Sequence, residues 1–295
     1  MSDARSPPKV HTCLRYSLGM ETGQYDAKWV EGFFDQYADQ EWNRLTLSPA
    51  REVQYAVHKH LLLQHLTSGF SVLEIGAGPG RFTKDMVELG CKVTVTDISQ
   101  VQIDLNRAKA AEHGFDHGVS EWRQLDMCDM SCFANESFDA VVAYGGPLSY
   151  VMDRRDDALR ECLRVLRPGG VILASVMSLW GTIHQHLEGV VGFTWEENQA
   201  IIASGDLCTS NAKFATHNCH MFRSGELRSF FESHGLTVLD MAAPNVLTPV
   251  HGENLKSVRE DQSRWKQVLE MELMASREPG FLDGGTHMII VGRKS

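Results

Sequence analysis

The chain has 295 residues, of which 43% are hydrophobic and 22% charged, proportions typical of a globular protein with a substantial core. Its formal net charge of −10 argues against a surface built to follow a nucleic-acid backbone. No run approaches the roughly 18 apolar residues of a membrane span, and the N-terminus lacks a signal-peptide pattern. We therefore expect a cytoplasmic protein that binds neither nucleic acid nor membrane.

Two amphipathic helices are predicted near residues 29–44 and 49–66. From residue 70 onward, short apolar runs alternate with helical patterns, which is typical of a parallel sheet covered by helices on both faces. The predicted strands cover residues 71–75, 92–96, 119–125, 138–143, 171–176, 236–241 and 287–292. Ser99, Asp153 and Ser224 are interpreted as N-caps of the intervening helices. Residues 179–219 and 245–284 interrupt this pattern, and the second interruption contains a charged helix near 254–276.

A glycine-rich loop, Gly76-Ala77-Gly78-Pro79-Gly80, follows the first predicted strand and opens a helix. Glycines at such a junction let the backbone approach a ligand closely, because no Cβ atom intervenes. The dinucleotide fingerprint G-x-G-x-x-G/A requires a small residue where this chain has Arg81, which argues against that class of site. No Lys-Ser/Thr pair follows, so a phosphate-binding P-loop is excluded too.

Residues 72–82 (VLEIGAGPGRF) strongly resemble motif I of class I S-adenosylmethionine (SAM) dependent methyltransferases. Asp97 ends the second strand, where that family places the acid for the ribose hydroxyls, and Asp126 follows the third, where it places an acid at the adenine amine. Residues 163–170 (LRVLRPGG) resemble the family's turn before strand five. The alternative is that both aspartates are helix caps or turn residues. The cofactor-binding residues implied by the resemblance are Glu74, Gly76, Ala77, Gly78, Gly80, Asp97, Ile98, Asp126, Met127, Ala143 and Tyr25.

The fold expected on this basis is α/β, a Rossmann-like seven-stranded mixed sheet with six parallel strands, an antiparallel last strand and helical cap inserts. We expect one methyltransferase domain over residues 1–295. Its parts are an N-terminal helical cap (1–69), a SAM-binding core (70–178), a cap insert (179–219) and a C-terminal part of the core (220–295). SAM is expected across the carboxyl ends of strands one to three, with S-adenosylhomocysteine (SAH) as its product. A homodimer is left open.

The acceptor pocket is expected at residues 144–150 (YGGPLSY), after the fourth strand. This segment lacks the Asn/Asp-Pro-Pro-Tyr motif of enzymes that methylate amide or adenine nitrogens, and it resembles the ubiquinone-type and other small-molecule methyltransferases. The predicted function is methyl transfer to an oxygen, nitrogen or carbon of a small-molecule metabolite. Positioning supplies most of the rate, and a histidine base is optional. Tyr144, His220 and His184 are the catalytic candidates, and the alternative for either histidine is a structural hydrogen-bonding role.

Three further hypotheses remain open. Tyr25 or Tyr37 could shield the sulfonium by a cation–π contact, or the N-terminal aromatic residues could simply be a helix face packed on the core. Cys208, His217, Cys219 and His220 lack the paired spacing of zinc ligands, so no metal is expected. The rival functions are a SAM-binding fold repurposed for a non-methylating reaction such as cyclisation, and a non-catalytic SAM-binding regulator.

Overall fold

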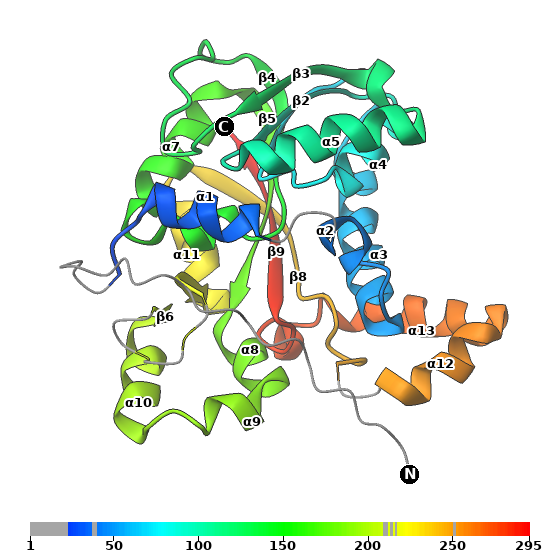
Figure 1. The fold of residues 1–295 in the computed structure, drawn as a ribbon, viewed down its shortest axis with the longest axis vertical. Coiled ribbons are helices and arrows are strands. Elements are labelled where there is room, and N and C mark those ends of the chain that lie inside the picture. The colour runs from blue at the N-terminus through cyan, green and yellow to red at the C-terminus, as the bar shows by residue number, and fades with distance from the viewer. Residues whose placement is uncertain (1–22, 37–39, 209–211, 213–214, 216, 250–251) are drawn as a thin grey trace.

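The computed structural model describes residues 23–36, 40–208, 212, 215, 217–249 and 252–295 (Figure 1). Its centre is a twisted sheet in which parallel strands follow the order β3-β2-β1-β4-β5. β9 pairs antiparallel with β5, and β8 pairs antiparallel with β9, so β8 runs in the same direction as β5. The predicted fold class, with six parallel strands and an antiparallel last strand, is confirmed. These seven strands are β1 (Ser71–Ile75), β2 (Lys92–Asp97), β3 (Val119–Gln124), β4 (Phe138–Ala143), β5 (Leu166–Ser178), β8 (Leu236–Ala242) and β9 (His287–Lys294).

Two short strands extend the sheet beyond the predicted set. β7 (Cys219–Phe222) pairs in parallel with the last residues of β5, and β6 (Asp206–Leu207) pairs antiparallel with β7. This hairpin joins the insert that follows β5 to the edge of the main sheet.

Helices cover both faces of the sheet because successive strand residues point to opposite sides. The core helices are α3 (Pro49–His65), α4 (Arg81–Leu89), α5 (Gln100–His113), α7 (Arg155–Val165) and α11 (Ser224–Ser233). In β1, Leu73 and Ile75 pack in the core under α7 and α11, whereas Val72 packs in the core under α3, α4 and α5. Shorter helical turns are α6 (Pro147–Tyr150), η1 (Asp116–Gly118), η2 (Met152–Arg154) and η3 (Pro279–Phe281).

The predicted N-caps are confirmed at one position and wrong at two. The Ser99 side chain accepts a hydrogen bond from the Gln102 backbone N–H and caps α5. Asp153 instead lies inside a 3₁₀ turn, and its carboxylate accepts from the Tyr25 N–H. Ser224 is the first helical residue of α11, and its hydroxyl donates to Asp283.

The remaining helices lie outside the core layers. α1 (Ala27–Asp35) and α2 (Gln40–Arg44) replace the single helix predicted over 29–44, and residues 37–39 between them lie outside the described part. α8 (Leu179–Gln185), α9 (Leu187–Val190) and α10 (Trp195–Ser204) form the insert after β5. α12 (Gly252–Glu260) and α13 (Gln262–Ala275) replace the helix predicted over 254–276, because Asp261 interrupts it and caps α13. In Figure 1 these two inserts flank the lower end of β9. None of the helices in the described ranges is long and apolar enough to cross a membrane.

Candidate active site

A cavity of about 670 Å³ lies at the carboxyl ends of the parallel strands, the position where open α/β sheets bind ligands. Its volume falls within the range of small-molecule sites. Its floor comes from the segments that follow β1, β2, β3 and β4, and its cover comes from α1, α2, α8, α9 and the β6–β7 hairpin. The pocket is therefore built from core and insert together.

The glycine loop needs its glycines for two separate reasons. Gly76, Gly78 and Gly80 all have positive φ angles, of 65°, 53° and 95°, a region that side chains with a Cβ rarely adopt. Space is also limited, because a Cβ at Gly80 would lie 2.8 Å from the Asn106 amide nitrogen. The Gly78 N–H points to the end of β2, where it donates to the Asp97 carboxylate at 2.9 Å.

Asp97 is buried at the cavity wall, and its two oxygens accept from the Gly78 and Ser99 N–H groups, each at 2.9 Å. Burial raises the pKa of its carboxyl to about 6, against the opposing effect of those two hydrogen bonds. The nearby carboxylates of Glu41 and Asp35 add to this rise in the pKa. Each carboxylate oxygen has two lone pairs, so Asp97 retains acceptor capacity toward a ligand.

Asp126 lines the same cavity from the segment after β3, and its Oδ1 accepts from the Cys128 N–H at 2.8 Å. Tyr25 lies beside it, and burial together with the Asp126 charge raises the pKa of the Tyr25 phenol. Tyr25 therefore stays a protonated donor next to this carboxylate. Tyr37, the other aromatic candidate, lies outside the described residues.

The cavity brings together most of the predicted ligand residues. Those that line it are Gly76, Ala77, Gly78, Asp97, Ile98, Asp126, Met127, Tyr25 and Tyr144. Glu74, Gly80 and Ala143 lie behind the lining. Glu74 points to the α4 side of the sheet, where its Oε2 accepts from the Thr83 hydroxyl at 2.5 Å, and burial raises its pKa to about 8.

The two histidine candidates are placed differently from the prediction. His220 is buried, its Nδ1 lies 2.7 Å from Asp206 and its Nε2 lies 2.7 Å from Glu226. Its neighbours on β7, Cys219 and Met221, line the cavity, so strand alternation directs His220 away from it. His184 is exposed on α8 and does not line the cavity either. The prediction that His220 or His184 is a base facing the acceptor is therefore wrong.

The comparisons with known proteins agree with this geometry. Residues 72–170 match the methyltransferase domain family. The ubiquinone/menaquinone biosynthesis C-methyltransferase of Hahella chejuensis is 38% identical over 110 residues, covering 36% of this chain and 42% of that protein. The mitochondrial ubiquinone biosynthesis O-methyltransferase of Rattus norvegicus is 29% identical over 195 residues, covering 63% of this chain and 49% of that protein. Residues 72–170 therefore carry a methyltransferase domain of the class I SAM-dependent kind. The chain spans less than half the length of the first curated relatives it matches.

Solved structures support the fold of this methyltransferase domain at low sequence identity. A methyltransferase from Haloferax volcanii, solved in complex with the Trm112 methyltransferase activator, aligns with a TM-score of 0.56 at 19% identity, covering 88% of this chain and 96% of its own. The [4+2]-cyclase SpnF also aligns with a TM-score of 0.56, at 16% identity, covering 94% and 98% of the two chains. A protein named as a methyltransferase and one named as a cyclase therefore share this fold, and the likeness shows the fold alone.

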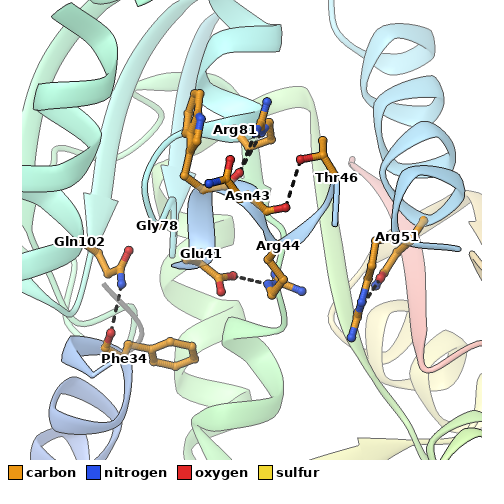
Figure 2. Close-up of polar contacts among 12 residues, drawn as sticks. Phe34, Glu41, Asn43, Arg44, Thr46, Arg51, Gly78, Arg81 and Gln102 are labelled. Atoms are coloured by element: carbon orange, nitrogen blue, oxygen red, sulfur yellow. Dashed lines mark hydrogen bonds and ion pairs between the residues drawn. The ribbon is translucent and has the colours of Figure 1, made fainter. Parts of the chain in front are cut away.

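The cavity also contains charged residues that the sequence did not indicate. Glu41, Arg44 and Arg51 line it from α2 and α3 (Figure 2). The Arg44 Nε donates to the Glu41 Oε1 at 2.5 Å, whereas the Arg51 Nη1 donates to the neutral Gln54 Oε1 at 2.9 Å. Among the described residues Arg51 has no carboxylate partner. Burial lowers the pKa of its guanidinium, and the positive charge of Arg44 lowers it further.

The residues present fit SAM, the cofactor of this domain class. SAM combines a ribose diol, an adenine amine, an ammonium and a carboxylate, and the cavity offers buried acceptors together with an arginine that lacks a carboxylate. The buried Gln102 Oε1 has no hydrogen-bond partner in the described structure, and a Cβ at Gly78 would stand 3.8 Å from it. A buried unsatisfied acceptor beside the glycine loop is consistent with a ligand that supplies a donor there.

Proposed function

We propose that this protein transfers a methyl group from SAM to an oxygen, nitrogen or carbon atom of a small molecule. The observation that carries the proposal is the continuity of one cavity. It extends from the glycine loop and Asp97 to Thr182, His186 and His217 beneath the insert after β5. A cofactor and an acceptor placed in the two halves would meet without crossing solvent, as in-line transfer requires.

We assign the cofactor half as follows. The Asp97 carboxylate accepts the ribose hydroxyls, Asp126 accepts the adenine amine, and the glycine loop allows close backbone approach. Arg51, with Arg44 beside it, suits the methionine carboxylate because its guanidinium has unused donors. When bound, SAM supplies a methyl group on an electron-poor sulfonium.

Apolar side chains line much of the acceptor half, and its histidines are His186, His217 and His287. Burial lowers the pKa of His217, and partial desolvation with the Arg51 charge lowers the pKa of the more exposed His186, so both imidazoles are neutral near pH 7 and able to accept a proton. We propose these two histidines as base candidates in place of His220 and His184. Tyr144 lines the cavity, its hydroxyl donates to the His58 carbonyl oxygen at 3.4 Å, and burial raises the pKa of its phenol, so it forms a wall and does not act as a base.

The experiment that tests this proposal is incubation with methyl-labelled SAM and fractionated small-molecule extract, followed by mass spectrometry. Transfer predicts labelled products heavier by one methyl group, together with SAH in equal amount. An Asp97→Ala variant serves as the control for background transfer. A product of unchanged mass, formed without SAH, would instead indicate a non-methylating reaction such as cyclisation.

A further inference from the structure

Arg81 stands where the dinucleotide fingerprint requires a small residue, and its side chain connects two segments far apart in the sequence. It begins α4, and its side chain reaches α2 (Figure 2). Its Nε and Nη2 both donate to the Trp42 carbonyl oxygen, at 3.2 and 2.6 Å. Its guanidinium carbon also lies 4.2 Å from the centre of the Trp42 ring, within the range of a cation–π contact.

Contacts with other neighbours also hold the Trp42 side chain in place. Its ring stacks on His113 of α5 with a centroid separation of 4.8 Å and an interplanar angle of 13°. The Trp42 side chain is only 7% exposed. The backbone of α2 is thus held by Arg81, while the Trp42 ring is inserted between α4 and α5. A helix of five residues has little stability of its own, so these contacts decide where it lies.

The consequence of this arrangement lies on the cavity side of α2. Glu41 and Arg44 line the cavity, and a Cβ at Gly78 would stand 3.8 Å from the Glu41 Cγ. The Glu41 charge also contributes to the raised pKa of Asp97, which places the two carboxylates within electrostatic range. Moving α2 away would therefore open one wall of the cofactor half.

We propose that Arg81 is a positioning residue that latches α2 over the cofactor site and thereby slows the release of bound SAM or SAH. This inference rests on the proposed function for its ligand, but the latch itself is a property of the free protein. Arg81 acts by holding Glu41 and Arg44 in place. Its loss leaves the glycine loop and Asp97 intact and frees α2 to move.

The test compares Arg81→Gln with Arg107→Gln, a matched control in which the arginine also stacks on a tryptophan, Trp122, but lies outside the cavity lining. We expect Arg81→Gln to raise both the dissociation rate and the dissociation constant of SAH about tenfold. This is the effect expected from losing one or two hydrogen bonds that a charged group donates. Amide hydrogen exchange over residues 40–47 should accelerate by at least the same factor in the free protein. Arg107→Gln should leave all three quantities within twofold of wild type.

A double-mutant cycle distinguishes positioning from direct contact with the ligand. If Arg81 acts through α2, its replacement in a Glu41→Gln/Arg44→Gln background should change the SAH dissociation constant by less than twofold. An undiminished tenfold effect in that background would overturn the latch, as would unchanged exchange over residues 40–47 in Arg81→Gln. If Arg81→Gln fails to fold, the same measurements are made on Arg81→Lys. It keeps the charge but loses the two-pronged donor, so it should give the same faster exchange to a smaller degree. Failure of wild type to bind SAH would contradict the proposed function alone, and the exchange measurement would still decide the latch.

Discussion

Gly76 lies so close to Pro147 that a Cβ atom at Gly76 would come within 2.6 Å of the Pro147 Cγ. The glycine loop after β1 and the first turn of α6 after β4 are therefore in direct contact at the floor of the cavity. A side chain at this position would push apart the two segments that line the meeting point of the cofactor and acceptor halves.

We expect Gly76→Ala to weaken SAH binding by more than tenfold, because it adds both the clash with Pro147 and the cost of a positive φ, which alone is roughly 1 kcal/mol. Titration calorimetry measures the binding. Gly69→Ala is the matched control, since Gly69 also has a positive φ, of 88°, but has no atom within 4 Å of the added Cβ. That variant should lose stability and keep its affinity. Wild-type affinity in Gly76→Ala would show that the contact does not shape the site.

The raised pKa of Asp97 predicts a pH dependence of cofactor binding. Burial raises this pKa to about 6 in the free protein, and only the ionised carboxylate is a pure acceptor for the ribose hydroxyls. As the pH falls below about 6, SAH affinity should therefore drop, approaching tenfold per pH unit if ionisation is required. Isothermal titration from pH 7.5 to 5 checks the slope. Asp97→Asn should bind more weakly and lose this slope, whereas an equally steep slope in Asp97→Asn would assign the titration to another group.

Glu74 is expected to be protonated near neutral pH, because burial raises its pKa to about 8 even though the Thr83 hydroxyl donates to it. The folded state then binds this proton more tightly than the unfolded state, whose pKa is 4.5, so stability should fall as the pH rises toward about 8 and level off above it. Glu74→Gln should remove that fall and leave the protein at least as stable as wild type at pH 7, because an amide has no proton to lose on unfolding. Thermal unfolding between pH 6 and 9 measures both, with Glu88→Gln on the exposed side of α4 as the control. Strong destabilisation by Glu74→Gln at pH 7 would indicate an ionised Glu74.

His220 is expected to contribute to stability. Burial disfavours its charged form, but hydrogen bonds to Asp206 and Glu226 outweigh burial and raise its pKa. The stabilisation is complete below the unfolded-state pKa of about 6.5 and is lost as the pH rises through the higher folded-state value. His220→Ala should cost about 2 kcal/mol at pH 6, below the cost of a fully buried pair because the Glu226 side chain is 38% exposed. Denaturant unfolding checks this with His184→Ala, on an exposed histidine, as the control. Equal stability of the two variants would contradict the assignment.

Much of the fold follows from the apolar pattern of the sequence. The runs at 71–75 and 138–143 coincide with β1 and β4, because a strand buried on both faces has a nearly continuous apolar sequence. The boundary between α12 and α13 was missed because Asp261 interrupts a pattern that remains helical on both sides. An N-cap aspartate in the middle of a long helical pattern was the available signal.

The residues of the candidate site were also predictable from the sequence only in part. The acids and glycines at strand ends were predictable because the carboxyl ends of parallel strands meet at one edge of the sheet. The orientation of His220 was not, because β7 was not predicted and alternation gives a direction only once a strand is known. Arg51 and Glu41 carry no sequence signal, since each looks like an ordinary charged residue on an amphipathic helix. Only the packing of α2 and α3 places them at the cavity.

Calorimetric titration of the purified chain with SAH shows whether the cavity at the strand ends binds the cofactor product. We expect saturable binding of one SAH per chain, weakened more than tenfold by Asp97→Ala, while Asp104→Ala on the exposed side of α5 retains wild-type affinity. Absence of detectable SAH binding by the folded wild-type chain would contradict a cofactor site in this cavity, and equal affinity in Asp97→Ala would contradict the role of Asp97 in it.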